Sequence, residues 1–302
     1  MWFWFSLAAL LCWSGSDLFS KLGCKGQDDK RSHLKMLTAV GFVMGLHCAY
    51  SLIWGGTVLT GRILLHYLPV SLLYISSMAI GYLGLRYIEL SISSPICNSS
   101  GALVAILALI TGGRGSVNNV QMIAVGLVCI GVILLGIVEA TESEELRLAR
   151  QQKGNQIYTK STLALVIPLL YCLLDALGTF ADALVLESLD ESSANAAYEL
   201  TFFIVGLVCF IYAVVIRKDR LIFRQELPKY AGACFETAGQ FAYIFALGDS
   251  DHVMLAAPII SAYCAVSVLW GRLFLKEQLS RKHYASIACI LVGIVLIGIY
   301  DI

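Results

Sequence analysis

The chain of 302 residues is 58% hydrophobic, only 14% of its residues are charged, and its mean hydropathy is +0.78. Soluble domains average about 45–50% apolar and about 25% charged residues, so this composition argues strongly against a soluble fold and excludes disorder. Lys and Arg number 21, as do Asp and Glu, so the net charge is zero and gives no reason to expect nucleic acid as a partner.

Ten apolar stretches are long enough to cross a bilayer as helices, which takes roughly 20 mostly apolar residues. Backbone polar groups in lipid must bond within their own segment, so each stretch is expected to be helical. The fold class is therefore an all-α integral membrane protein with ten transmembrane helices, in contact with the lipid bilayer. In chain order the stretches are residues 2–22, 34–55, 63–86, 90–111, 118–138, 161–182, 194–216, 229–248, 251–274 and 283–300.

One polar segment, residues 140–160, divides these stretches into two sets of five. With ten spans, every Lys and Arg except Arg62 and Arg114 falls on the side of the membrane that holds this segment. Cytoplasmic loops carry the excess of Lys and Arg. We therefore expect a cytoplasmic linker, both termini on the non-cytoplasmic side, and a multi-pass protein of the cell (plasma or inner) membrane.

The two halves of the chain resemble each other at a nearly constant offset. Residues 95–96 and 258–259 are both Pro-Ile, and residues 131–137 correspond to residues 293–299, with Gly at the first and sixth positions of each. A unit of five spans is odd, so residues 1–139 and residues 161–302 form inverted five-helix repeats. Such repeats are typical of secondary transporters, whose substrate site lies near the bilayer midplane between the halves.

The end of the second unit resembles an EamA-type unit of the drug/metabolite transporter superfamily. The features that carry the resemblance are Pro258, Gly271, the turn from Lys276 to Ser280 with Glu277 and Leu279, and Gly293. The first half follows the pattern at Gln121 and Gly131 but has Gly115 where Glu is usual, and the second half has His283 and Ser286 where Gln and Gly are usual.

The resemblance implies two five-helix units, transport of a metabolite, and a leaning toward export. It also implies cytoplasmic termini, which the distribution of Lys and Arg contradicts.

The stretch 229–248 carries the sharpest candidate for a functional site. Glu236, Gln240 and Tyr243 are spaced i, i+4 and i+7, so they share one helix face. A charge near the bilayer centre costs about 2.5–3.5 kcal/mol on insertion scales, so such residues are functional candidates by default. Glu236 can bind and release a proton or pair with a cationic substrate; the alternative is a hydrogen bond that locks two helices together.

Two further stretches place acids inside the membrane. Asp175 lies near the middle of residues 161–182, with Tyr171 one turn before it, whereas Asp182 approaches the outer end and is expected to be solvated. Asp17 and Lys21 are spaced for an intrahelical ion pair, with a charged pathway lining as the alternative. Glu199 is expected in a water-exposed vestibule.

Prolines and hydroxyl groups complete the candidate cavity, which we expect between spans 1, 3, 4, 6, 8 and 9. Pro95 and Pro258 are expected to kink their helices, or to serve packing alone. Polar groups beside them and in the third span are candidate ligands, although each is singly more often a helix–helix hydrogen bond. These residues are Tyr74, Ser77, Asn98 and Tyr263.

These features favour a secondary active transporter that moves a small organic metabolite by alternating access, with export and proton coupling expected. Buried acids with few buried bases favour an amino-acid-like, cationic or neutral solute. The alternatives are a non-transporting scaffold or sensor subunit, or a polytopic membrane enzyme, although H-E-x-x-H and Asp-rich turns are absent.

The remaining motifs point to structure rather than chemistry. We expect no catalytic residue, metal or cofactor, since residues 249–252 are a weak metal cluster and the ten cysteines lack metal spacing. Gly41 and Gly45 form a G-x-x-x-G motif that marks a close helix contact, either within the chain or in a homodimer.

Overall fold

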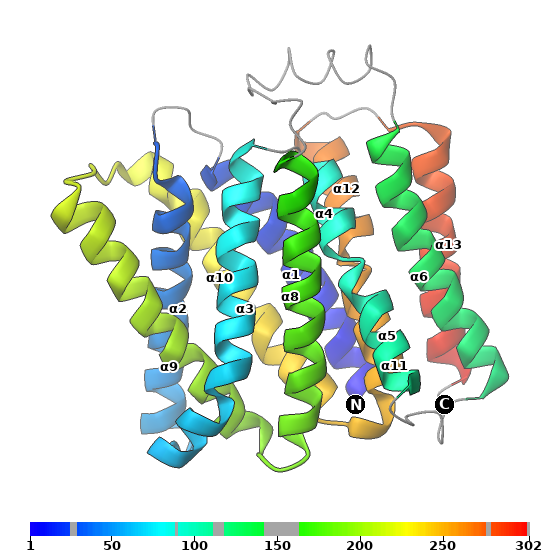
Figure 1. Cartoon of the computed structure of the whole chain (residues 1–302), viewed down its shortest axis with the longest axis horizontal. Helices are drawn as coiled ribbons and strands as arrows, with labels where there is room; N and C mark the ends of the chain where they lie inside the picture. Colours follow the sequence, from blue (N-terminus) through cyan, green and yellow to red (C-terminus); the bar gives the residue numbers. More distant parts are fainter. Residues whose placement is uncertain (25–28, 88–89, 111–117, 142–162, 276–278, 301–302) are drawn as a thin grey trace.

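The computed structural model describes residues 1–24, 29–87, 90–110, 118–141, 163–275 and 279–300, and this part of the chain is helical, with no strand. The expected turn residues 276–278 and most of the linker 140–160 lie outside it. Figure 1 shows the helices side by side, most of them along one common direction, with the start of α1 and the end of α13 on the same side of the molecule.

Each stretch that was expected to be helical overlaps one to three helical elements of the structure. The elements in chain order are α1 (Trp2–Cys24), α2 (Ser32–Ile53), α3 (Gly61–Tyr87), α4 (Leu90–Cys97), α5 (Ser100–Ile110), α6 (Asn119–Ala140), α8 (Leu163–Leu186), α9 (Glu191–Phe210), η2 (Ile211–Ile216), α10 (Phe223–Leu247), η3 (Ser250–His252), α11 (Val253–Ser261), α12 (Tyr263–Phe274) and α13 (Arg281–Tyr300).

Seven helical segments of the described chain are long and apolar enough to cross a membrane. The long helices α1 and α10 are not among them, because both carry polar and charged residues along their length. They pack against each other over most of their length. Their polar faces therefore meet inside the protein, where a helix need not be apolar to lipid.

Two stretches that were expected to be continuous helices are broken. The first divides into α4 and α5 at Asn98, and the second divides into α11 and α12 at Ala262. A proline has no backbone N–H to donate and crowds the preceding turn. Pro95 and Pro258 lie within one turn of these breaks, so each proline is associated with an interruption rather than a simple kink.

Helices of the two halves pack in pairs: α1 with α10, α2 with α9, α3 with α8, α5 with α11, and α6 with α13. The G-x-x-x-G motif belongs to the second pair. A Cβ added to Gly41 would lie 2.6 Å from the Phe202 carbonyl oxygen and 3.0 Å from Gly206 Cα, and one added to Gly45 would overlap the Phe203 ring. The motif therefore makes a close contact within the chain.

We expect Gly41→Ala to lower the thermal unfolding temperature, because the new methyl group would meet backbone atoms that cannot move independently. Gly126→Ala is the matched control, since nothing lies within 4 Å of its added Cβ and alanine is the better helix former. Unfolding of both variants in detergent measures the effect. Equal unfolding temperatures for Gly41→Ala and the wild type would contradict the close α2–α9 contact.

A four-membered buried ion cluster joins the start of α2 to the start of α10. Lys229 Nζ lies 3.3 Å from Asp29 Oδ2 and 3.2 Å from Glu226 Oε2, and Lys35 Nζ lies 3.1 Å from Asp29 Oδ1 and 3.7 Å from Glu226 Oε1. The side chain of Lys229 is fully buried and that of Lys35 is 6% exposed. These two lysines, which entered the sequence analysis as charges of loops and span ends, are therefore part of the packed protein.

Beside this cluster, Arg31 and Asp219 form a salt bridge in which Arg31 Nε donates to Asp219 Oδ2 at 2.6 Å. The hydrogen bond from Arg31 holds the pKa of Asp219 below its ordinary value. A carboxyl whose pKa is lowered by folding stabilises the protein above its unfolded pKa, about 3.9, and loses that contribution as pH falls through the lowered value.

We expect Asp219→Asn to be slightly less stable than the wild type at neutral pH and equally stable once Asp219 is protonated in acid. Urea unfolding of the two proteins in detergent at a series of pH values measures the difference. A difference that persists unchanged at acid pH would show that the asparagine acts through something other than the lost charge.

Candidate functional site

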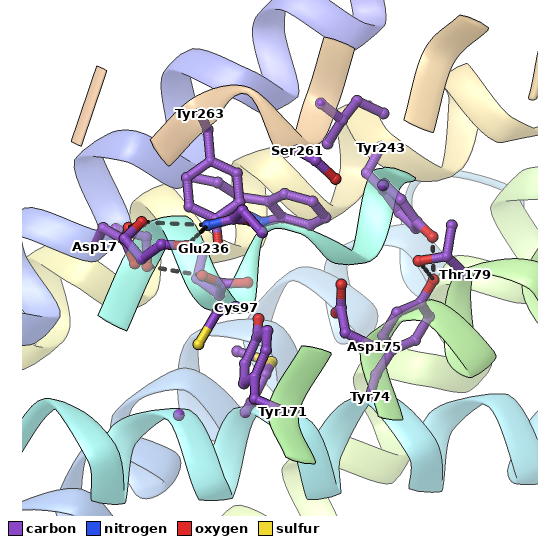
Figure 2. Close-up of a pocket in the computed structure, with 18 of the residues that line it drawn as sticks. Asp17, Tyr74, Cys97, Tyr171, Asp175, Thr179, Glu236, Tyr243, Ser261 and Tyr263 are labelled. Carbon is purple, nitrogen blue, oxygen red and sulfur yellow. Dashed lines mark hydrogen bonds between the residues drawn. The ribbon is translucent and has the colours of Figure 1, made fainter. Parts of the chain in front are cut away.

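A cavity lies among α1, α3, α4, α5, α8, α10, α11 and α12, with Tyr198 of α9 at its wall. Its empty volume is about 940 Å³, counting the part that is open. The polar and aromatic side chains that converge on it make this cavity the candidate site for a small organic solute. Figure 2 shows three carboxyl groups within it: Asp17 and Glu236 toward one side, and Asp175 toward the hydroxyl groups of Tyr74 and Tyr243.

Asp17 of α1 is held by helices of the other half as well as its own. Its Oδ2 accepts hydrogen bonds from Ser94 Oγ at 2.6 Å and from Ser267 Oγ at 2.8 Å. The expected intrahelical ion pair is wrong, because Lys21 Nζ instead donates to the Leu85 carbonyl at 2.8 Å and is buried. Asp17 therefore faces the cavity, as the alternative interpretation proposed.

Glu236 of α10 bonds to α1. Ser16 Oγ donates to Glu236 Oε2 at 2.7 Å. Gln240 and Tyr243, on the same face of the helix, also line the cavity and are almost fully buried. The i, i+4, i+7 spacing therefore brings these three side chains to one wall.

Asp175 of α8 accepts a hydrogen bond from Ser100 Oγ of α5 at 2.7 Å. Tyr171 and Thr179, one turn before and after it, line the same cavity. Thr179 Oγ1 accepts a hydrogen bond from Tyr74 of α3 at 3.1 Å, and the Tyr74 hydroxyl also contacts the hydroxyl of Tyr243. This hydroxyl cluster closes the Asp175 end of the cavity (Figure 2).

The other predicted residues divide into those that line the cavity and those behind it. Asn98 and Tyr263 line it, and Asn98 Nδ2 donates to the Ser94 carbonyl at 2.8 Å. Ser77 lies behind the wall and donates to the Tyr74 carbonyl at 2.8 Å. Pro95 and Pro258 are not in the lining, although both precede residues that are.

Two acids that were expected to be solvated are fully buried, which corrects the sequence analysis. Asp182 Oδ1 accepts a hydrogen bond from Tyr67 at 2.6 Å. Glu199 Oε1 lies 2.7 Å from His47 Nδ1 and accepts a hydrogen bond from Asn195 at 3.0 Å. Asp182 lies near the end of α8 and Glu199 lies within α9, and side chains of neighbouring helices cover both.

We expect Tyr67→Phe to destabilise the protein by about 1–3 kcal/mol, the usual cost of leaving a buried polar group without its partner. The variant would leave Asp182 without the Tyr67 donor in a site that water does not reach. Tyr50→Phe serves as the control because Tyr50 is exposed. Denaturant unfolding of both variants measures the cost, and equal stabilities would contradict the buried hydrogen bond.

Sequence reasoning missed five residues that line the cavity: two serines, a methionine, a threonine and a tryptophan. They are Ser16, Ser20, Met78, Thr179 and Trp13. A signal was available for α1: residues 13, 16, 17 and 20 follow helical spacing and so share one face. For α8, Thr179 lies one turn from Asp175 on the face that was already recognised.

The charge of the site is one-sided. The described lining residues include Asp17, Asp175 and Glu236 but no Lys, Arg or His. The ion pairs of the described residues also leave these three carboxyl groups out. Within the same residues, no group of three His, Cys, Asp or Glu is placed to hold a metal ion. The arrangement is suited to binding protons or a positively charged group.

Comparisons with known proteins give a family match over the second half of the chain and a similar fold over nearly all of it. Residues 161–299 match the model of the EamA-like transporter family. No curated protein matches the chain. Among solved structures, one crystal structure, whose description says no more than that it is a protein, is similar in fold. The match covers 99% of this chain and 96% of that chain, with a TM-score of 0.66 and 12% sequence identity. An identity this low shows a common fold and nothing about the solute.

Proposed function

We propose that this chain is a secondary transporter of a small organic metabolite. The proposal starts from the match of residues 161–299 to the EamA-like transporter family. The observation that carries the proposal is the polar cavity, whose carboxyl groups come from α1, α8 and α10. A cavity built from both halves of the chain can be exposed to either side when the halves move relative to each other.

The pattern of helix pairs supports an inverted repeat of residues 1–139 and residues 161–302. If α1 to α6 correspond to α8 to α13, then the packing of α1 on α10 has its counterpart in the packing of α8 on α3. The pairs α2 with α9 and α6 with α13 each join equivalent helices, and the packing of α5 on α11 has its counterpart in the packing of α12 on α4. This is the pattern that a two-fold axis between the halves would produce.

Alternating access is supported by what lies beyond the two ends of the cavity. The buried ion cluster of Asp29, Lys35, Glu226 and Lys229 ties α2 to α10 where both helices begin. Toward the end where α3 begins and α8 ends, Tyr67 bonds to Asp182. Opening either end would require these contacts to separate, while the cavity between them stays in place.

We further propose proton coupling, export from the cell, and termini on the non-cytoplasmic side. The three carboxyl groups can exchange protons with whichever side the cavity faces. Placing the Lys- and Arg-rich side in the cytoplasm puts the ion cluster at the cytoplasmic end of the cavity. The amino-acid-like, cationic or neutral nature of the solute follows from an acidic lining without a described base.

Uptake by the purified protein in liposomes tests the function. A mixed metabolite pool is offered with an imposed pH gradient, and the trapped solutes are identified by mass spectrometry. We expect at least one solute to accumulate above the level of protein-free liposomes, and a protonophore to remove the accumulation. Folded protein that moves no solute would favour the scaffold or enzyme alternatives.

A further inference from the structure

We propose that the cavity recognises an organic cation, an ammonium group carried on an aromatic or apolar body. This inference rests on the proposed transport function, because it names the solute of the same cavity. Three independent features of the lining carry it: free carboxylate oxygens, aromatic walls, and the sign of the charge.

The first feature is that each cavity carboxyl group uses only one oxygen within the protein. Asp17 Oδ2, Glu236 Oε2 and Asp175 Oδ2 accept the hydrogen bonds from serine. The second oxygen of each has no donor among the described residues, yet it is not sealed off like Oδ2 of Asp182, which is buried without a partner. These oxygens are therefore acceptors directed at the cavity and available to a solute.

The second feature is the number of aromatic rings in the wall. Trp13 stands 5.0 Å from Tyr243 and 5.8 Å from Tyr263, measured between ring centroids, and Tyr171 lies beside Asp175 (Figure 2). Ring faces attract a cation within about 6 Å, with Trp the strongest. The full aromatic lining is Trp13, Tyr74, Tyr82, Tyr171, Tyr198, Tyr243 and Tyr263.

The third feature is the absence of a partner for a negatively charged solute. The described lining residues contain no Lys, Arg or His, so a solute carboxylate or phosphate would face three acids without a counter-ion. Serine hydroxyl groups stabilise each carboxylate only in part, and a buried charge needs a charged partner or a proton. An ammonium group supplies the partner, with its N–H groups on the free carboxylate oxygens and its body against the rings.

Three probes that share a phenylethyl body separate charge from shape: phenethylammonium, 2-phenylethanol and 3-phenylpropanoate. Calorimetric titration of the purified protein in detergent measures their binding. We expect the cation to bind at least about tenfold more tightly than the neutral or anionic probe, a difference of about 1.4 kcal/mol. We also expect choline to bind more tightly than its uncharged analogue 3,3-dimethylbutanol.

Variants of the three cavity carboxyl groups test whether the preference for the cation arises in the cavity. Asp17→Asn, Asp175→Asn and Glu236→Gln should each weaken binding of phenethylammonium while the neutral probe is unaffected. Glu187→Gln, which alters an exposed acid outside the lining, should change neither. Circular dichroism and thermal unfolding show which variants remain folded, and the comparison is made on those.

The binding and liposome measurements test cation recognition and transport separately. Equal or tighter binding of 2-phenylethanol or 3-phenylpropanoate, or no binding of either cation at about 10 mM, would overturn the cation proposal. If liposomes still accumulate another solute, transport stands without it. If the cations bind at the cavity but none crosses the membrane, the recognition stands and the transport function fails.

Discussion

Replacing Glu236 by Gln is expected to abolish solute accumulation driven by a pH gradient, reducing it to the level of protein-free liposomes. The carboxyl group bonds to Ser16 of α1 and leaves its second oxygen to the cavity. A group in that position can carry a proton in one orientation of the protein and release it in the other. The glutamine amide keeps the size of the side chain and can still accept the hydrogen bond from Ser16, but it exchanges no proton. The pH gradient can therefore no longer drive accumulation of the solute.

A separate assay distinguishes lost coupling from lost binding. Exchange of labelled for unlabelled solute, without a pH gradient, needs no net proton movement, and Glu236→Gln should retain more exchange than accumulation. Glu187→Gln should behave as the wild type in both assays. Undiminished, gradient-dependent accumulation by Glu236→Gln would remove Glu236 from the coupling mechanism and leave Asp17 and Asp175 as the candidates.

The residues of α10 show what a single helix reveals from sequence alone. Glu236, Gln240 and Tyr243 were grouped by their spacing, and the structure places all three in the wall of one cavity. Helical periodicity fixes which side chains share a face, so a polar face within an apolar stretch marks a site. The same rule, applied to Trp13, Ser16, Asp17 and Ser20 of α1, would have found the adjoining part of the wall that α1 contributes.

Depth within the protein is what the sequence analysis misjudged. Asp182 was expected near the outer end of its span and Glu199 in a water-exposed vestibule, so both were expected to contact water. Tyr67 of α3 and His47 of α2 cover them instead. Burial depends on residues more than 100 positions away in the chain, which local patterns do not identify.

The same limitation applies to the lysines of the ion cluster. Lys35 and Lys229 lie near the starts of their helices, where a positive charge is usually exposed at the membrane surface. The structure buries both between Asp29 and Glu226. These charges bind α2 to α10, a tertiary role that a count of Lys and Arg by loop does not predict.

We expect Lys229→Met to destabilise the protein by about 3–5 kcal/mol, the usual cost of removing one partner from a buried ion pair. The variant would leave Asp29 and Glu226 with Lys35 as the one remaining cation of the cluster. Methionine is close to the lysine side chain in length, so lost packing adds little to the effect. Unfolding in detergent, induced by heat or by increasing SDS, measures the loss of stability.

Two control variants show whether the lost stability comes from the buried charge of Lys229 or from the loss of any positive charge at this end of the molecule. Lys30→Met removes an exposed positive charge from the same end of the molecule and should leave stability unchanged. Lys229→Met combined with Glu226→Gln removes one charge of each sign and leaves Lys35 paired with Asp29, so it should recover part of the lost stability. Two results would show that the ion cluster does not hold α10 to α2: a Lys229→Met variant as stable as the wild type, or a double variant less stable than the single one. The closure of this end of the cavity would then have to come from apolar packing between these helices.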